Sequence, residues 1–278
     1  MIVMNKLNEK KIIELMNSKK SKVISEDVEV FRLGNEQCAV CVDTLVESTD
    51  IPKGSKLIDI SRKGFSDACK EFKIQLLGGD TNQGREISIH VVLFGTLKKY
   101  IKRKNAKIGN LICTTGAFGY TMAALDIILK KKKSSRVFSK KSKDLFFRPN
   151  PRLGFGIKSA KYITSCMDSS DGLSSCLNEM SRQSKKKFEI TNYPTNEDVK
   201  EFSKRNRMNL KKLVFDGGEE FELVFTTSPK NLSKIRKVAR ESNIKIFQIG
   251  HVTKGNGVFF DDEKESFRIK DKGWQHFR

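Results

Sequence analysis

Alternation of apolar and polar positions predicts β-strands in the first 115 residues. Three segments alternate over strand-like lengths and a fourth is a short apolar run: residues 28–33, 38–46, 87–97 and 111–115. Gly34 and Asn35 separate the first two segments, and glycine and asparagine are common turn residues. The pattern therefore predicts a β-hairpin near the start of the chain.

Helical patterns and further strands follow along the chain. The expected helices are residues 58–72, 120–129, 196–209 and 229–241. The expected strands in the second half are residues 188–190, 223–226 and 244–249, with a turn at Gly250 and a hairpin in residues 255–278. Strands and helices alternate over much of the chain, which indicates an α/β fold of α+β type.

The stretch LLGGDTNQG, residues 76–84, places a carboxylate and a hydroxyl on a glycine turn. The apolar run at residues 74–77 is interpreted as a buried strand, and Gly78 and Gly79 allow a tight turn after it. Asp80 and Thr81 then lie at the strand's end, where hard oxygen ligands suit Mg²⁺. Asp and Gly are also ordinary turn formers, so this stretch alone equally fits a plain loop.

Asp43 is a second candidate for chemistry, because it lies inside the apolar strand at residues 38–46 and is followed by Thr44. A buried acid is costly unless it is paired or binds a metal. The alternative is that Asp43 faces solvent on a half-buried strand.

Two further turns carry candidate groups. TTGAFG at residues 114–119 joins a strand to a helix, an arrangement that offers backbone N–H groups to a phosphate, although its spacing matches neither the Walker nor the Rossmann pattern. DSSDG at residues 168–172 places two acids and two hydroxyls before a helix. Helix capping explains one of these four groups, and a cation-binding helix entry explains all of them.

Composition and charge limit the class of protein. No run approaches the ~20 apolar residues of a membrane span, and the first residues lack the apolar region of a signal peptide, so we expect a cytoplasmic protein. The six cysteines lack the spacing of a zinc site or a disulfide framework and are expected to be reduced. Cys38 and Cys41 form C-x-x-C, but in a strand they point to opposite faces.

The formal net charge of +21 raises a nucleic-acid hypothesis. Much of the charge lies in residues 97–107 and 130–143, where few aromatic residues are available to stack on bases. Solvated loops and helix faces explain such charge more simply, so specific nucleic-acid binding is not expected.

The domain organisation follows from the same basic segment. Residues 130–143 are poor in apolar positions and are expected to be a linker or loop. The segment RPNPR, residues 148–152, then forms a stiff extended corner because proline restricts itself and the residue before it. We expect an N-terminal domain at residues 1–130, a basic linker at 131–147 and a C-terminal domain at 148–278.

Acidic turns recur in a chain that is otherwise strongly basic. Besides Asp43 and Asp80, they include Asp168 with Asp171, and Glu219 with Glu220 after a second double glycine. Phosphoryl transfer from a magnesium nucleotide uses such groups, because its catalysis is mostly positioning and neutralisation of phosphate charge.

In this order the motifs resemble those of the thiamine-monophosphate kinase family. They are VDTLVE (42–47), LLGGDTNQG (76–84), TTGAFG (114–119), RPNPR (148–152), DSSDGL (168–173) and GGEEFEL (217–223), and the closing GWQHF also fits. This family is part of the superfamily named for aminoimidazole-ribonucleotide synthetase. The resemblance implies a two-domain fold, with an N-terminal mixed sheet with helices that pairs in a homodimer and a C-terminal α/β sandwich.

The resemblance also implies a reaction and a set of site residues. The reaction is ATP-dependent phosphorylation of thiamine monophosphate to thiamine diphosphate, with Mg²⁺ as cofactor. Magnesium would be held by Asp27, Asp43, Asp80 and Asp171. Catalytic roles would fall to Asp80, Asp171 and Arg103, and nucleotide binding to Thr44, Gly79, Thr81, Gly116, Gly119, Ser170 and Glu219. Arg148 and Arg152 would hold the domain junction or contact a phosphate.

Three departures from the family pattern bear on activity. The family's Gly-Asp-Asp is Ser25-Glu26-Asp27 here, so only Asp27 carries over. GGEDYEL is GGEEFEL, which lengthens one acid and removes one hydroxyl. A helix and strand of the family, with a further metal carboxylate, have no counterpart near residues 63–64. The alternatives are therefore a catalytically impaired homologue that binds nucleotide or thiamine phosphate, and a related ATP-dependent synthetase of the superfamily.

Overall fold

The computed structural model describes residues 28–50 and 64–274. The chain forms two compact units, Glu26–Lys98 and a second that contains Lys99–Arg278. The division into residues 1–130, 131–147 and 148–278 stays a prediction. Among the described residues, no helix has both the length and the apolar character that a membrane crossing requires.

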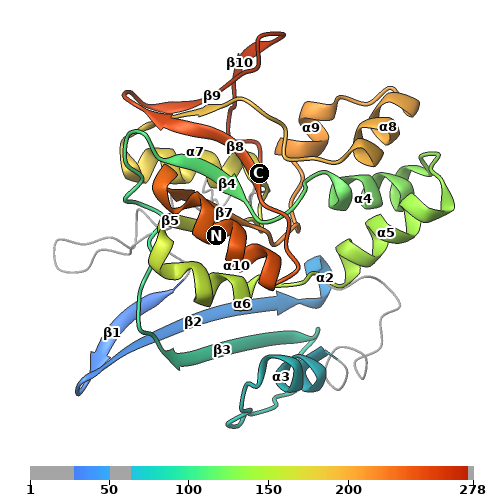
Figure 1. Cartoon of the computed structure of the whole chain (residues 1–278). Helices are drawn as coiled ribbons and strands as arrows, with labels where there is room; N and C mark the ends of the chain where they lie inside the picture. Colours follow the sequence, from blue (N-terminus) through green and yellow to red (C-terminus); the bar gives the residue numbers. More distant parts are fainter. Residues whose placement is uncertain (1–27, 51–63, 275–278) are drawn as a thin grey trace, which may run out of the picture. The chain divides into compact units, whose positions relative to one another are not determined.

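The first unit contains a three-stranded antiparallel sheet and two short helices (Figure 1). Its strands are β1 (Glu29–Leu33), β2 (Glu36–Val46) and β3 (Ser88–Thr96), in the order β1-β2-β3. Its helices are α2 (Glu47–Asp50) and α3 (Ser66–Phe72). The predicted hairpin is confirmed, and Gly34 at its turn has a φ of 61°, a conformation that favours glycine. Mixed strand pairing, which was expected for this domain, occurs in the second unit's sheet instead.

Strand alternation divides the side chains of the first unit's sheet between two faces. Side chains at directly paired positions share a face, and Val42 pairs with Val92 while Asp43 pairs with Val91. One face carries five exposed apolar side chains, between 40% and 64% exposed, which we call the apolar face: Phe31, Leu33, Val42, Val92 and Phe94. Asp43 lies on the opposite face. The C-x-x-C cysteines are likewise on opposite faces, as predicted, with Cys38 buried on the side of the apolar face.

The buried strand predicted at residues 74–77 is wrong. These residues form neither helix nor strand, and Leu76 and Leu77 are 73% and 81% exposed. An apolar run becomes a strand only where a neighbouring strand offers its backbone, and no described strand pairs with this segment. The double glycine and Asp80 therefore follow an extended, exposed segment.

The second unit is built on a seven-stranded mixed sheet of order β10-β9-β6-β8-β4-β7-β5. Neighbouring strands are antiparallel except β6 and β9, which are parallel. The strands are β4 (Leu111–Thr114), β5 (Ile163–Asp168), β6 (Lys187–Ile190), β7 (Leu223–Thr227), β8 (Phe247–Thr253), β9 (Gly257–Asp261) and β10 (Ser266–Arg268).

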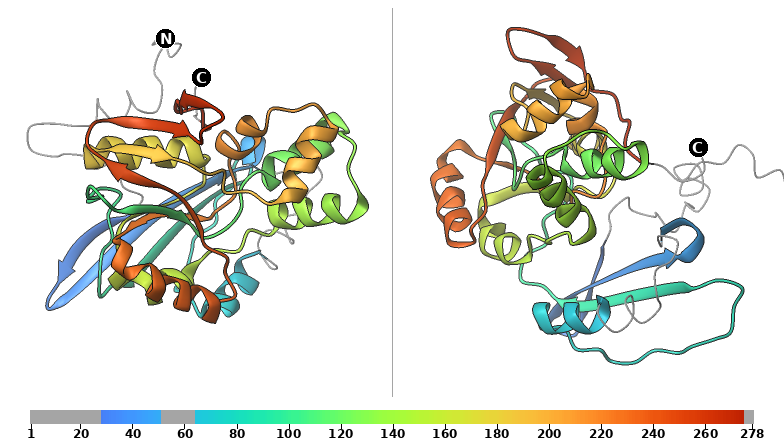
Figure 2. Two further views of the ribbon diagram at one scale, coloured as in Figure 1. Left: turned by 45° about the horizontal axis from the view of Figure 1, so that its top comes forward. Right: turned by 90° about the vertical axis from the view of Figure 1, so that its right-hand side faces the viewer.

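Helices cover both faces of this sheet (Figures 1 and 2). The unit's helices are α4 (Tyr120–Lys130), α5 (Arg136–Phe147), α6 (Leu153–Ser159), η2 (Ala160–Tyr162), α7 (Leu173–Ser184), α8 (Glu197–Arg205), α9 (Leu210–Phe215), η3 (Pro229–Asn231) and α10 (Leu232–Glu241). Helix α7 packs on one face around Phe188 and Ile249, while α6 and α10 pack on the other around Phe225. Neighbouring strand residues supply the two cores, because Ile112 belongs to the first and Cys113 to the second. The expected C-terminal α/β sandwich is confirmed.

Much of the basic segment at residues 130–143 is helical, because α5 begins at Arg136. Helix α5 begins after Ser135, whose hydroxyl accepts the Phe138 N–H at 3.1 Å. Phe138 is buried and stacks on Phe202 of α8, with ring centroids 4.9 Å apart. One buried aromatic residue and one cap thus order a segment whose many lysines suggest a loop.

Gly250 does not form the predicted turn but lies inside β8. A Cβ atom there would lie 2.0 Å from the Glu189 carbonyl oxygen on β6. The glycine therefore permits two strands to approach closely, which is a common reason for glycine within a strand.

Candidate functional site

The acids predicted in the first unit are exposed and available for binding. Asp43 lies in β2, and its Oδ1 accepts the Thr44 N–H at 2.8 Å. Asp80 makes the same local bond with the Thr81 N–H at 2.8 Å, and its Oδ2 accepts from the Asn82 side chain at 3.4 Å. Such bonds to the next residue fix the direction of each carboxylate while leaving it solvent-accessible.

Thr44 is held by a partner on the neighbouring strand. Its hydroxyl lies 3.0 Å from Nδ1 of His90 on β3. His90, which the sequence suggested to be a packed strand residue, instead has an exposed side chain that contacts Ser88 and Thr44. Thr44 and His90 are directly paired across β2 and β3, so the Thr44 hydroxyl lies on the face opposite to the Asp43 carboxylate.

In the second unit, the turn after β5 and the turn before β7 pack directly against each other. The backbone carbonyl of Ser170 accepts the Glu219 N–H at 2.6 Å, and that of Ser169 accepts the Phe221 N–H at 3.0 Å. A Cβ atom at Gly218 would lie 2.7 Å from the Ser170 carbonyl oxygen, so glycine is required for this approach. The structure thus brings together Ser170, Asp171 and Glu219 from two motifs far apart in the sequence.

Glu220 connects the turn before β7 with the start of α4. Its Oε1 accepts hydrogen bonds from the backbone N–H groups of Gly119 at 2.7 Å and Thr121 at 3.3 Å. A carboxylate is favoured at a helix N-terminus by the helix dipole. The N–H of Gly119, which the sequence suggested for a phosphate, therefore has an anionic partner within the protein.

Burial raises the pKa of Glu220 to about 7, and the hydrogen bond from Gly119 opposes this rise. The folded protein thus holds this proton more tightly than the unfolded chain, whose value is 4.5. This contribution to stability is fully present below pH 4.5 and is lost as the pH rises through about 7.

We expect Glu220→Gln to remove this pH dependence, because the amide keeps a carbonyl acceptor but does not titrate. Urea unfolding of both proteins at pH 5, 6, 7 and 8 measures the effect. The free energy of unfolding of the wild type should fall relative to that of the variant as the pH rises. Glu201→Gln, an exposed change on α8, should follow the wild type. Parallel pH profiles for wild type and Glu220→Gln would contradict the assignment.

A buried ion pair lies beside Gly116. Arg152 binds Glu222 through both Nε, at 2.7 Å, and Nη2. The Thr115 hydroxyl donates to the same carboxylate at 2.6 Å and accepts the Leu223 N–H at 2.8 Å. A Cβ atom at Gly116 would lie 2.1 Å from Glu222 Oε1, so the carboxylate rests on the glycine backbone. Arg152 therefore holds the β7 motif to the TTGAFG turn, within one unit.

Two residues of this region are not among the predicted site residues. Glu222 could have been found from the sequence, because an acid at the start of an apolar strand must be paired when it is buried. The side chain of Ser169 is fully buried, and its Oγ has no hydrogen-bond partner among the described residues. An unsatisfied buried hydroxyl has no signal in the sequence, because it depends on packing.

The other predicted residues have clear positions. Arg103 is buried in the segment before β4. Asp171 follows β5, and its backbone carbonyl accepts the Trp274 N–H at 3.1 Å. All six cysteines are free thiols, as predicted, and burial raises the pKa of Cys113 and Cys166 to about 12. These two are therefore not thiolate nucleophiles at neutral pH.

The donor set fits a hard cation. Asp27 lies outside the described residues, and residues 28–50 and 64–274 contain no group of three or more His, Cys, Asp or Glu gathered for a metal. The carboxylates of Asp43 and Asp80 are nevertheless exposed oxygen donors with fixed local orientation. Magnesium typically takes one or two such carboxylates together with water and phosphate oxygens.

Comparison with known proteins gives a consistent assignment. Residues 109–263 match the family model "AIR synthase related protein, C-terminal domain". The thiamine-monophosphate kinase of Nitrosopumilus maritimus (strain SCM1) is 43% identical over 314 aligned positions, which cover 99% of this chain and 100% of that protein. The enzyme of the same name from Pyrococcus horikoshii is 35% identical over 218 residues, covering 78% of this chain and 66% of that protein.

A solved structure shares the fold. The structure described as AaThiL complexed with AMPPCP and TMP has a TM-score of 0.82 and 23% identity, and covers 99% of both chains. The alignment with the Nitrosopumilus protein is longer than the 278 residues of this chain, so that relative contains residues with no counterpart here. Lys63, where the missing segment was predicted, lies outside the described residues. On full-length identity, domain match and shared fold, this chain belongs to the thiamine-monophosphate kinase family.

Proposed function

We propose that this protein transfers the γ-phosphoryl group of ATP to the phosphate of thiamine monophosphate, giving thiamine diphosphate and ADP. The observation that carries this proposal is the 43% identity to a thiamine-monophosphate kinase over its entire length. The six motifs of the sequence lie in the family's order. A bond forms between an oxygen of the acceptor phosphate and the γ-phosphorus, and the bond to the β-phosphate oxygen breaks.

The acidic residues carry the metal-binding part of the proposal. Asp43, Asp80 and Asp171, together with Asp27, would hold Mg²⁺, which when bound neutralises charge on the nucleotide phosphates. Ser170 adds a neighbouring hydroxyl oxygen, and the Thr44 N–H holds the Asp43 carboxylate in place. The acids come from one strand and separate turns, which suits a cation that receives only a few of its oxygens from the protein.

Nucleotide contacts are proposed for the glycine turns and their neighbours. Gly79, Thr81, Gly116, Gly119, Ser170 and Glu219 are the proposed set. Because the Gly119 N–H donates to Glu220, the contribution of Gly119 would be close backbone approach and not that hydrogen bond. Arg103 would neutralise phosphate charge.

The acceptor requires little activation. A phosphate monoester has a second pKa near ~6, so at neutral pH its oxygen is already largely an oxyanion. Positioning two anionic substrates and neutralising their charge are then the main tasks of the protein. This explains why the motifs consist of acids and glycines and include no general base.

The test is direct. Folded protein is incubated with ATP, Mg²⁺ and thiamine monophosphate, and products are separated by chromatography. We expect equal amounts of thiamine diphosphate and ADP. Thiamine without its phosphate serves as a control acceptor and should give neither product. Absence of thiamine diphosphate with well-folded wild-type protein would contradict the proposal.

A binding protein without turnover is the second candidate. It is favoured by the residues that the longer relative has and this chain lacks. Calorimetric titration with a non-hydrolysable ATP analogue and with thiamine monophosphate separates the two candidates. Binding of both ligands without product selects the impaired homologue, whereas binding with product selects the kinase.

We also propose that the apolar face of the first unit joins two copies of this chain. It exposes Phe31, Leu33, Val42, Val92 and Phe94 on one side of a sheet. Contiguous exposed apolar surface of this kind is typical of an interface. Sedimentation analysis should give twice the mass of one chain, and Val92→Lys should give a monomer. Gln37→Lys adds the same charge on the opposite face of the sheet, where Gln37 pairs with Arg32, and should leave the dimer intact. A monomeric wild type would contradict this.

A further inference from the structure

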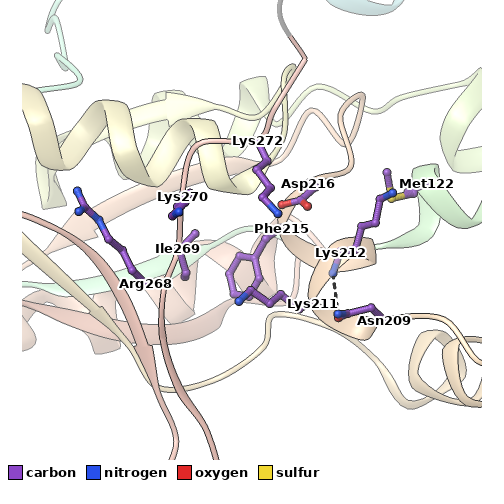
Figure 3. Close-up of a pocket in the computed structure, with 10 residues that line it drawn as sticks. All are labelled: Met122, Asn209, Lys211, Lys212, Phe215, Asp216, Arg268, Ile269, Lys270 and Lys272. Atoms are coloured by element: carbon purple, nitrogen blue, oxygen red, sulfur yellow. Dashed lines mark hydrogen bonds between the residues drawn. The ribbon is translucent and has the colours of Figure 1, made fainter.

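A large basic pocket lies in the second unit between α9 and the segment after β10 (Figure 3). Its volume is about 750 Å³, which is in the range of small-molecule and cofactor sites. The lining residues are Met122, Asn209, Lys211, Lys212, Phe215, Asp216, Arg268, Ile269, Lys270 and Lys272. None of them belongs to the proposed catalytic or nucleotide-binding set.

Positive charge converges on this pocket from two walls. Helix α9 supplies Lys211 and Lys212 to one wall. The other wall consists of Arg268, the last residue of β10, and Lys270 and Lys272 from the segment after it. These three residues are exposed, and buried Ile269 separates the first two. Asp216 is the single carboxylate among the lining residues, so five cations face one anion.

The protein's own groups balance only part of this charge. Burial is the main cause that lowers the pKa of Lys211 and the charge of Lys272 lowers it further, while the charges of Glu265 and Asp216 oppose the shift. Its Nζ lies 3.0 Å from the centre of the Phe267 ring, which places the cation on an aromatic face. Lys272, Lys212 and Lys211 all act on Asp216, yet burial still raises the pKa of that carboxyl group. A ligand with several negative charges would therefore relieve real repulsion.

Apolar side chains close the pocket beneath the basic walls. Phe215 and Ile269 are only 1% and 2% exposed, so they fill the floor without offering a free ring face. The ring of Phe215 lies between the lysines of the two walls in Figure 3, and half-buried Met122 lies at one end of the pocket. An apolar group of a ligand can pack on Met122 while its charged part contacts the lysines.

We propose that this pocket binds a nucleoside di- or triphosphate, with the base beside Met122 and the phosphates on the two basic walls. Several phosphate charges match the excess of cations, and a neutral base can pack on the thioether of Met122. Thiamine diphosphate fits less well, because its thiazolium ring adds a positive charge to an already basic pocket.

The pocket is tied to the proposed catalytic turn by backbone contacts. Lys272 N–H donates to the Ser174 hydroxyl at 3.2 Å, and Trp274 N–H donates to the Asp171 carbonyl at 3.1 Å. A nucleotide that contacts Lys272 thus acts on a segment bonded to the start of α7. The site is consequently suited to sense nucleotide as well as to bind it.

Lysine footprinting tests the proposal at the pocket itself. Protein in EDTA is reductively methylated with and without ATP, and the rate at each lysine is measured by mass spectrometry. At about ten times the dissociation constant, methylation of Lys211 and Lys272 should slow about tenfold. Lys230 and Lys237, exposed on η3 and α10, should be unaffected. Unchanged rates at Lys211 and Lys272, or equal slowing at the control lysines, would overturn the site.

Two further arms test the ligand class. Inorganic tripolyphosphate and thiamine diphosphate should each protect the pocket lysines less than ATP at equal concentration. Equal protection by tripolyphosphate would overturn the role of the base, and equal protection by thiamine diphosphate would overturn the discrimination by ring charge.

A matched pair of variants checks the contacts. Lys211→Gln with Lys272→Gln should raise the ATP concentration that protects Lys212 and Lys270 by about tenfold or more, because two charge-assisted contacts are lost. Lys230→Gln with Lys237→Gln removes the same charge elsewhere and should leave it unchanged. An equal shift in both variants would show that only net charge matters.

Discussion

Replacing Asp80 with Asn is expected to lower the rate of thiamine diphosphate formation by about 10²–10³-fold or more, to the limit of detection. The amide has the same shape and its carbonyl can still accept the Thr81 N–H. Only the negative charge is lost, and with it the proposed bond to magnesium. Because Asp80 is exposed, the free energy of unfolding should change by no more than about 0.5 kcal/mol.

Steady-state assays over a range of Mg²⁺ concentrations distinguish a metal ligand from a general electrostatic effect. If Asp80 binds the metal, the residual rate of Asp80→Asn should continue to increase at Mg²⁺ concentrations well above those that saturate the wild type. Glu36→Gln removes an equal charge from an exposed position of the same unit and should keep wild-type activity. Retention of more than about a tenth of the rate by Asp80→Asn would contradict the role given to Asp80.

Replacing Glu222 with Ala is expected to lower the free energy of unfolding by about 3–5 kcal/mol. The change leaves the Arg152 guanidinium, on a side chain that is only 18% exposed, without its carboxylate and deprives the Thr115 hydroxyl of its acceptor. An uncompensated buried charge costs more than the pair contributes, so removing one partner is the severe case. Urea unfolding followed by circular dichroism measures the loss.

Two controls show whether the loss of unfolding free energy comes from the burial of the ion pair or from the loss of any ion pair. Glu197→Ala breaks the exposed Lys200–Glu197 pair, whose atoms are 2.6 Å apart, and should cost only about 0–1 kcal/mol. The double change Glu222→Leu with Arg152→Met removes both buried charges and should cost clearly less than Glu222→Ala alone. A loss below about 1 kcal/mol for Glu222→Ala would contradict a buried, structural ion pair.

Local pattern sufficed for elements whose side chains alternate within one strand or repeat along one helix. The strand at residues 87–97 and the helix at residues 120–129 appear as β3 and α4 with nearly the predicted bounds. The local pattern failed where pairing or packing with a distant segment determines the secondary structure. Residues 74–77 have a strand's composition but no described strand to pair with, and α5 has a loop's composition but a buried Phe138. Partners are set by the fold and not by the local sequence.

In the candidate site, likewise, the residue types could be predicted from the sequence but their contacts could not. Acidic residues and glycines on turns were visible in the sequence, since their chemistry is unusual in a basic chain. The contacts among them were not, because Thr115 and Glu222 are joined across 107 positions and Gly119 and Glu220 across 101. Such contacts follow only when β4 and β7 are known to be neighbours.

The two faces of β2 restrict how this strand can change in length. Asp43 and Val42 are adjacent in sequence but project to opposite sides, one to the proposed metal site and one to the apolar face. Insertion or deletion of a single residue between the hairpin and Asp43 would exchange these sides for every later position. Length variants of this strand should therefore survive only when residues are gained or lost in pairs. In the turn before it, Gly34 alone requires a residue that tolerates a left-handed backbone.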